Sequence, residues 1–312
     1  MARTTLGVLK AYYAYSRQRF PLSGALLYAG SLFSAAYCFA GLLGQSEPAA
    51  VAPWLLGVFV SFASLLRLRI VDEHKDSAKD RLAYPDRLLS RGEVTLSGLR
   101  RIYAACIVAE AAISASRGTA VLAAWLVLLG YSLLMSAEFF APRVLNRSMG
   151  LYLVTHQLLV PVTALYGVVF RGGAWDRATS EPAMLALFLF TAICSTITYE
   201  IARKTWHPER EREGADSYTK SWGHGATVAA NAAFAAGALA GFGALFSRYA
   251  AHPAHPTVAL ALFLGVAITA IRFYRQPTAA RSSAVAGAGA AFLVGQLANA
   301  AIAFALSSAA AG

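Results

Sequence analysis

Long apolar stretches alternate with short polar segments along most of this chain. The stretches 23–44, 183–199 and 282–306 contain no lysine, arginine, aspartate or glutamate. A hydrocarbon core of about 30 Å needs roughly 20 apolar residues in an α-helix. Scanning with this length predicts an all-α membrane protein, a bundle of nine transmembrane helices at 22–44, 51–68, 100–116, 119–136, 151–170, 183–203, 224–247, 257–273 and 283–308.

Only Arg117 and Gly118 separate the third and fourth of these spans, so one continuous helix there would reduce the count to eight. The distribution of basic residues among the loops favours nine transmembrane helices, because lysine and arginine accumulate on the cytoplasmic side of a membrane. With nine helices and a cytoplasmic N-terminus, 23 of the 27 basic residues fall on that side. The pattern therefore predicts a cytoplasmic N-terminus and a C-terminus outside.

The composition supports the same class of protein. Hydrophobic residues make up 57% of the chain and charged residues 14%, with a mean hydropathy of +0.52. We expect an integral membrane protein of a bacterial-type inner membrane, with the lipid bilayer as its first partner. The net charge of +11 does not indicate nucleic-acid binding, because no soluble basic domain is present to hold a strand.

Residues 1–312 are predicted to form one transmembrane domain. Two acidic polar segments, 70–99 and 204–222, fall on the cytoplasmic face, each after an even-numbered helix. Late in the chain, glycine and alanine dominate 229–243 and 284–291, which allows helices to approach each other closely.

The segment from residue 72 to 80 carries the clearest chemical signal. Asp72, Glu73, Asp76 and Asp80 recur at helical spacing, so on a helix their carboxylates project from one face. Like charges at this spacing repel unless a cation bridges them, and Mg²⁺ prefers carboxylate and phosphate oxygens. The alternative is a solvated amphipathic loop without a metal site.

Arginines around this segment favour a phosphate-binding site over a solvated amphipathic loop. Arg69 and Arg87 flank the acidic positions, and an arginine guanidinium matches the oxygens of a diphosphate group. The segment is therefore a candidate site for magnesium and a diphosphate.

The same residues resemble a known family. Asp72 to Asp80 is similar to the first aspartate-rich motif of the UbiA superfamily of intramembrane prenyltransferases, Asn-Asp-x-x-Asp-x-x-x-Asp, with Asp72 for Asn and Glu73 for Asp. Residues 87–94 resemble the family stretch Arg-Pro-Leu-x-x-Gly-x-Val, with Leu88 for Pro. The resemblance implies a magnesium-dependent enzyme acting on an isoprenyl diphosphate.

The second acidic segment departs from that pattern. The family usually carries Asp-x-x-x-Asp after helix six; here Glu200 stands at the first position and Lys204 at the second. Either a downstream carboxylate completes a metal site, or this half binds diphosphate through Arg203 and Lys204. The candidate downstream metal ligands are Glu209, Glu213 and Asp216.

Several polar and aromatic side chains are further candidates for a cavity. An ionisable group inside a membrane span is a functional candidate by default, although a neutral pair, an interfacial position or a satisfied core histidine would also explain these residues. Aromatic side chains near the cytoplasmic mouth either form the interfacial belt or stabilise an allyl cation. The candidates are Tyr84, Glu110, Glu138, His156, Tyr199 and Tyr218.

The resemblance to the UbiA superfamily implies an enzyme that ionises an isoprenyl diphosphate with Mg²⁺ and transfers the prenyl group to a lipophilic acceptor. The resemblance leaves a terpene cyclase of the UbiA type open, in which the cation closes on its own double bonds. Phosphoribosyl transfer to a polyprenyl phosphate and transport of a divalent cation are further alternatives.

Overall fold

The computed structural model describes residues 5–43, 50–145, 147–172, 175–211, 216–249 and 252–311. Across these residues the chain is helical and contains no strand. The helices are α1 (Thr5–Arg19), α2 (Leu22–Ala40), α3 (Val51–Ala83), α4 (Leu96–Ser116), α5 (Thr119–Ser136), η1 (Glu138–Phe140), α6 (Pro142–Leu145), α7 (Met149–Gln157), α8 (Leu159–Gly172), α9 (Trp175–Ala178), α10 (Pro182–Arg203), η2 (Pro208–Arg210), α11 (Tyr218–Arg248), α12 (Ala254–Arg275) and α13 (Ala279–Ala311).

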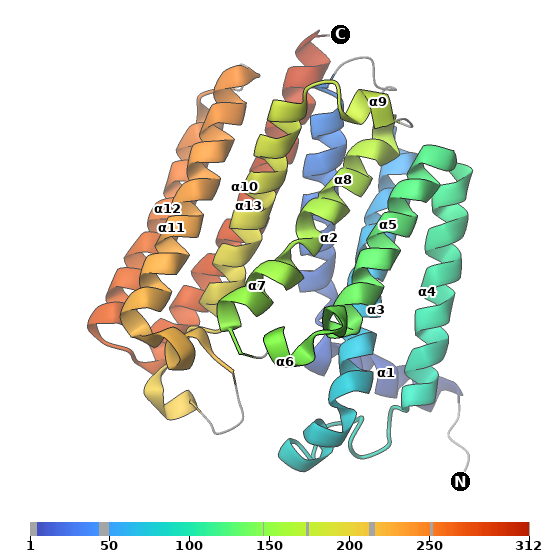
Figure 1. Ribbon diagram of the computed structural model, residues 1–312, viewed down its shortest axis with the longest axis vertical. Helices are drawn as coiled ribbons and strands as arrows, with labels where there is room; N and C mark the ends of the chain where they lie inside the picture. The colour runs from blue at the N-terminus through green and yellow to red at the C-terminus, as the bar shows by residue number, and fades with distance from the viewer. Residues whose placement is uncertain are drawn as a thin grey trace.

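The long helices run roughly parallel in one bundle (Figure 1). Helices α2 to α5 form one side and α10 to α13 the other, and the contacts of α2 with α13 and of α8 with α10 join them. Helix α1 and the last turns of α13 lie at opposite ends of the bundle. The end that carries α1, α6 and α7, together with the last turns of α3, is called the site end below.

Eight helical spans in the described part of the chain are long and apolar enough to cross a membrane, and one of them, Met149–Arg171, consists of α7 and α8 together. The predicted span 100–116 coincides with α4, which is a separate helix from α5. It is not among the eight, because Arg100, Arg101 and Glu110 add three charges to it. The all-α membrane fold is thus confirmed, while nine crossings and the orientation of the termini stay predictions.

The predicted fifth span, 151–170, is broken into α7 and α8. Pro161 lies in the first turn of α8 and has no N–H to donate to the preceding turn, so regular α-helical bonding is interrupted near Leu158. The break turns α7 away from the bundle axis at the site end (Figure 1).

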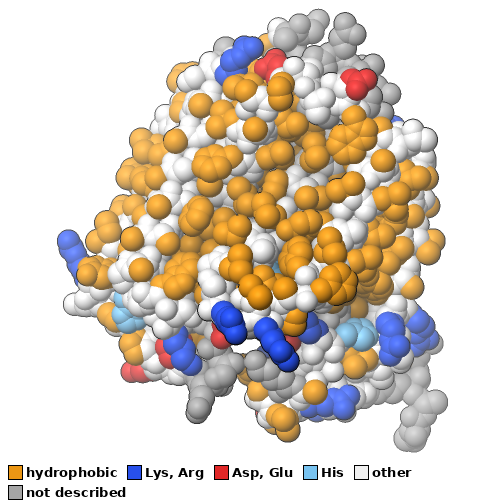
Figure 2. Space-filling view, in the orientation of Figure 1, with side chains coloured by type: hydrophobic (Ala, Val, Ile, Leu, Met, Phe, Trp, Pro, Cys, Tyr) orange, Lys and Arg blue, Asp and Glu red, His pale blue; other side chains and the backbone are white. Residues whose placement is uncertain are grey.

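Apolar side chains cover the middle of the molecule, and charged groups gather mainly at the site end, with a few at the other (Figure 2). Inside the bundle, small residues let helices approach closely, as their composition predicts. A Cβ built on Gly289 of α13 would lie 2.4 Å from the Ala202 Cβ of α10. One on Gly241 of α11 would lie 2.2 Å from the Thr191 Oγ1 of α10. These contacts bring α11 and α13 against α10.

Candidate functional site

Helix α3 carries the first acidic segment beyond the apolar layer. Its 33 residues span about 50 Å at about 1.5 Å per residue, more than a hydrocarbon core of about 30 Å. The helix runs without a break into the segment 72–80, so the helix predicted there is confirmed. The acidic side chains are therefore held on a rigid element at the site end.

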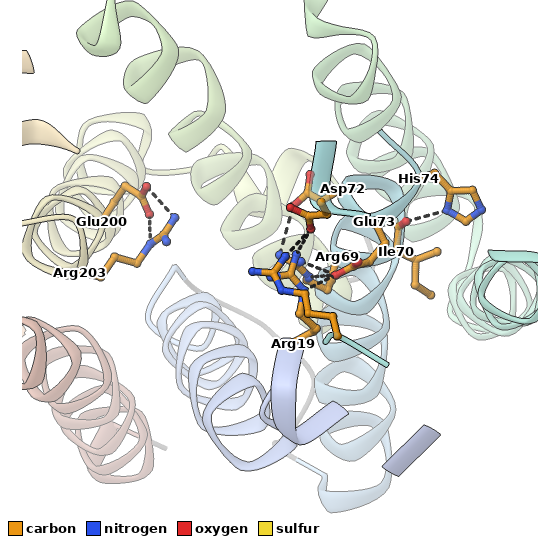
Figure 3. Close-up of polar contacts among 10 residues, drawn as sticks. Arg19, Arg69, Ile70, Asp72, Glu73, His74, Glu200 and Arg203 are labelled. Atoms are coloured by element: carbon orange, nitrogen blue, oxygen red, sulfur yellow. Dashed lines mark hydrogen bonds and ion pairs between the residues drawn. The ribbon is translucent and has the colours of Figure 1, made fainter. Parts of the chain in front are cut away.

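Two of the four carboxylates are bound by arginines from three segments. Arg19 of α1 bridges them, with its Nε 2.7 Å from Glu73 Oε1 and its Nη2 3.0 Å from Asp80 Oδ2. Arg69, one turn before Glu73 on α3, also pairs with it. Arg87 Nη1 lies 2.5 Å from Asp80 Oδ2. Figure 3 shows Arg19 and Arg69 beside Glu73. We call Arg19, Arg69 and Arg87 the arginine cluster.

Helix α1 brings a second side chain to this cluster. Tyr15 lies one helical turn before Arg19 and is almost fully buried, next to Arg69 and Glu73. Burial, together with the charge of Glu73, raises the pKa of the Tyr15 phenol above its ordinary value, against the opposing effect of the nearby arginines. The phenol is therefore neutral at physiological pH and can serve as a hydrogen-bond donor.

The other two carboxylates remain accessible. The Asp72 side chain is 55% exposed, and Arg69 Nη1 lies 4.0 Å from its Oδ2. Asp76 follows four residues later on the same face and is exposed. Although helical spacing predicts one face for all four acids, the arginine cluster binds Glu73 and Asp80 and leaves Asp72 and Asp76 facing outward.

Asp72 and Asp76 fit a magnesium ion whose other ligands are phosphate oxygens and water molecules. Mg²⁺ is commonly held by one or two carboxylates together with substrate phosphates and waters. Asp72 and Asp76 supply two such carboxylates one helical turn apart. Within the described ranges, no three acidic, histidine or cysteine side chains come close enough to hold a metal ion without other ligands.

The turn after α3 fixes Arg87. Its guanidinium stacks on the Tyr84 ring, 3.6 Å from the ring centroid. The turn closes with the Glu93 N–H donating to the Leu88 carbonyl at 2.9 Å, and Gly92 adopts a φ of 72°. A side chain at this left-handed position would be strained, which explains the glycine in this stretch. The sequence candidate Tyr84 thus supports Arg87.

Glu200, in the last turn of α10 just before the second acidic segment, is paired with its own neighbours. Arg203 Nη2 donates to Glu200 Oε1 at 2.7 Å, and Lys204 Nζ lies 3.5 Å from the same oxygen. Figure 3 shows Glu200 and Arg203 apart from the α3 group, on another helix. The buried Tyr218 ring lies 5.8 Å from the Lys204 Nζ.

The downstream acids do not gather around Glu200 in any contact of the described residues. Glu209 is 91% exposed and lies 3.9 Å from His207 Nδ1, and Asp216 is exposed. Glu213 lies outside the described residues. Glu211 Oε1 accepts hydrogen bonds from Ser217 and Thr219 at the start of α11 and so ties the loop to that helix. Glu211 Oε2 is buried and accepts no hydrogen bond from the described residues.

Helix α7 lies between the two acidic segments. The His156 ring stacks on the Tyr152 ring at 3.7 Å, and its Nδ1 lies 2.9 Å from the Tyr152 carbonyl oxygen. Glu138 pairs with Lys75 of α3. Tyr152 interacts electrostatically with Asp72 and Asp76 of α3, with Glu138 and with Glu200 of α10. Two sequence candidates, His156 and Glu138, therefore line the region between α3 and α10.

Glu110 belongs to a different network. It is fully buried, with Oε1 2.8 Å from Arg67 Nε of α3 and Oε2 accepting from Trp125 Nε1 of α5 at 2.9 Å. Ser64 and Ser132 complete the group. Of the alternatives left open by the sequence, the structure favours a paired carboxyl: Glu110 links α3, α4 and α5 rather than joining the acids of the site.

The arrangement of the helices matches solved membrane proteins. A digeranylgeranylglyceryl phosphate synthase superposes with a TM-score of 0.63 over 96% of this chain and 99% of that chain, at 14% sequence identity. The apo structure of a UbiA homolog from Aeropyrum pernix K1 superposes with a TM-score of 0.64 over 87% of this chain and 96% of that chain, at 19% identity. The chain has the UbiA fold.

No protein-family model and no curated protein matches the sequence. The likeness therefore concerns the UbiA fold alone. The geometry of the site includes two side chains that sequence reasoning did not single out for the site, Arg19 and Tyr152. The sequence candidate Tyr199 packs against the main hydrophobic core of the bundle.

Proposed function

We propose that this protein is a magnesium-dependent intramembrane enzyme that ionises an isoprenyl diphosphate and transfers the prenyl group to a lipophilic acceptor. The observation that carries the proposal is the end of α3, where Asp72 and Asp76 lie beside the arginine cluster at the border of an apolar bundle. The UbiA fold of the chain supports it.

The arginine cluster supplies the fixed positive charge. Guanidinium groups bind phosphate oxygens through paired N–H donors, and here they are oriented by Glu73 and Asp80 before substrate arrives. As the C–O bond of the substrate breaks, negative charge grows on the diphosphate, and fixed donors stabilise that charge. Mg²⁺ held by Asp72 and Asp76 would supply further neutralisation of the leaving diphosphate.

The second acidic segment has a simpler role in this proposal. Because Glu200 is paired and the downstream acids are dispersed, Arg203 and Lys204 bind the diphosphate, and Glu200 orients them. We therefore favour charge from side chains over a second metal ion in this half. The apolar chain of the substrate then lies among the helices, where little water can reach an allylic cation.

Product analysis tests the proposal. The purified protein in lipid nanodiscs is incubated with geranyl, farnesyl and geranylgeranyl diphosphate, with and without a panel of lipophilic acceptors, and the products are identified by mass spectrometry. Prenylated acceptor is the expected product. Cyclic products formed without acceptor would show that the enzyme is a terpene cyclase and not a prenyltransferase. Intact substrates under all conditions would contradict the proposal.

The variant Asp76→Ala links the result to the site. We expect it to lose turnover of every substrate that the unaltered protein consumes. Retained turnover by this variant would contradict the assignment of the site to α3.

A further inference from the structure

Helix α1 is attached to the bundle by one side only. Ala11 and Tyr15 of α1 pack in a cluster with Ile70 of α3 and Leu99 of α4. Arg19, on the same side of α1, belongs to the arginine cluster. The side chains on the opposite side of the helix point away from the bundle.

The exposed side of α1 is apolar and basic. Leu6, Leu9 and Tyr13 are each between 61% and 63% exposed, and Lys10 and Arg17 are exposed as well. At about 3.6 residues per turn, these five side chains fall within an arc of about 100° around the helix axis. We call them the outer face of α1. Because large apolar side chains gathered on one face are unfavourable in water, the outer face indicates a partner.

The position of α1 indicates that this partner is the membrane. Only Phe20 and Pro21 separate α1 from α2, which is long and apolar enough to cross a membrane. On α3, the contact residue Ile70 lies about 20 Å before the helix end at Ala83, at about 1.5 Å per residue. Helix α1 therefore lies where the apolar part of α3 meets the charged segment, and it runs across the long helices rather than along them (Figure 1).

The charge of this region favours an anionic lipid. Residues 1–21 contain four basic residues and no acidic residue. Arg19 is paired with acids of α3 on the buried side, whereas no ion pair among the described residues involves Lys10 or Arg17. The positive charge of the outer face is therefore available to a partner outside the protein.

A groove on the same helix can receive a lipid headgroup. It is open, with a volume of about 370 Å³, and it is lined by Tyr13, Ala14, Arg17 and Gln18. The small side chain of Ala14 leaves room between its larger neighbours. A phosphate placed there can accept hydrogen bonds from the Arg17 guanidinium and the Tyr13 hydroxyl.

We propose that α1 lies in the membrane interface at the site end and binds anionic phospholipids through its outer face. Leu6, Leu9 and Tyr13 enter the border of the hydrocarbon layer, as in other interfacial amphipathic helices. Lys10 and Arg17 contact the headgroup phosphates, and each strengthens binding to an anionic surface about fivefold. The inference goes beyond the proposed function, because neither a substrate nor a metal ion takes part in it.

Hydrogen exchange in nanodiscs tests the preference for anionic lipid. The protein is reconstituted in phosphatidylcholine alone or in phosphatidylcholine with an equal amount of phosphatidylglycerol, and the backbone exchange of α1 is followed by mass spectrometry. Because bound lipid opposes local opening of the helix, we expect α1 to exchange at least about fivefold more slowly in the anionic nanodiscs. Equal exchange in the two lipids would overturn the proposal.

A pair of double variants assigns the preference to α1. Lys10→Gln with Arg17→Gln should lose the difference between the two lipids. The matched control is Arg272→Gln with Arg275→Gln, which removes two exposed charges at the end of α12, at the same end of the molecule. The control should keep the slower exchange in anionic nanodiscs. If both double variants lose the difference, the overall charge of this end attracts the lipid, and the proposal fails.

Photocrosslinking identifies what covers the outer face. In proteoliposomes that contain phosphatidylglycerol, p-benzoylphenylalanine replaces Leu9 or, as the control, Leu82, which is 88% exposed near the end of α3 and beyond the membrane border. We expect a phospholipid adduct at position 9 and none at position 82. A crosslinked protein dimer at position 9, or equal lipid capture at both positions, would overturn the proposal. Neither measurement requires turnover, so the result is independent of the proposed function.

Discussion

At the scale of single residues, the acids of α3 divide into two pairs with different surroundings. Glu73 and Asp80 are neutralised by arginines, so they orient positive charge. Asp72 and Asp76 are exposed and remain available to a metal ion. The division gives the four acids separable roles, which substitutions can distinguish.

Replacing an exposed acid should abolish most of the activity. We expect Asp72→Asn and Asp76→Asn each to lower kcat for prenyl diphosphate turnover by at least about 100-fold, because each removes a metal ligand. Steady-state assays over a range of Mg²⁺ concentrations measure the effect. Asp86→Asn, which alters an exposed carboxylate just after the segment, should retain wild-type rates. Equal losses in all three variants would contradict a specific metal role.

Arg19 should matter for the site although it lies on the N-terminal helix. We expect Arg19→Gln to lower kcat/KM for the diphosphate substrate by about tenfold, the effect of losing a hydrogen bond to a charged group. Arg17→Gln is the matched control, since Arg17 lies on the same helix and is exposed. Indistinguishable kcat/KM values for the two variants would show that the bridge of Arg19 to Glu73 and Asp80 has no catalytic consequence.

The sequence could predict the acids of this site but not their partners. The spacing of Asp72, Asp76 and Asp80 predicts a shared helical surface, because that is a local property. Arg19 is separated from Glu73 by 54 positions along the chain, so only the packing of α1 on α3 brings them together. Local periodicity contains no information on such a contact.

At the scale of helices, polar and small residues fix how the elements pack. Glu110 and Arg67 form a fully buried ion pair that Trp125 and two serines complete. Removing one partner of a buried pair leaves an uncompensated charge, which costs about 3–5 kcal/mol. The pair therefore acts on stability rather than on the chemistry of the site.

The single variant Glu110→Leu should lower the Tm markedly, whereas Arg67→Met combined with Glu110→Leu should recover much of the loss, because no buried charge then remains. Thermal unfolding in detergent or nanodiscs measures both. If the double variant is no more stable than the single one, Arg67 has a role beyond its pairing with Glu110.

Glycine positions on α13 provide a second test at this scale. Gly289 contacts Ala202 of α10, whereas a Cβ on Gly287 would meet nothing within 4 Å. Gly289→Ala should therefore destabilise the protein by about 1–3 kcal/mol through overpacking, and Gly287→Ala should not, since alanine favours the helix. Equal Tm values for the two variants would contradict the close packing of α13 on α10.

The positions of the helices were largely predictable, because the length of each apolar stretch in the sequence sets them. The predicted span 119–136 coincides with α5, and 183–203 differs from α10 by one residue. The sequence did not reveal the break between α7 and α8, although Pro161 could have indicated it. It also did not predict that α3 continues to Ala83 as one helix from the membrane span to the end of the acidic segment, since a change from apolar to charged residues resembles a helix end.

At the scale of the whole molecule, the bundle joins two polar regions to one apolar interior. Helices α3 and α10 carry their acidic segments to the same end, with Tyr152 of α7 interacting with both. The interior, lined by buried apolar side chains, offers an apolar chain shelter from water. In the proposed reaction, the diphosphate of the substrate leaves at the site end, and the reactive carbon of the same substrate lies in the bundle.

Metal dependence tests this account most directly. Release of inorganic diphosphate from farnesyl and geranylgeranyl diphosphate should be followed in nanodiscs with Mg²⁺, after thorough chelation with EDTA, and after Mg²⁺ is restored. We predict release with Mg²⁺, loss on chelation, full recovery on restoration, and no release by the double variant Asp72→Asn, Asp76→Asn in any condition. Undiminished release under chelation, or equal release by the double variant, would contradict a metal-assisted diphosphate site on α3.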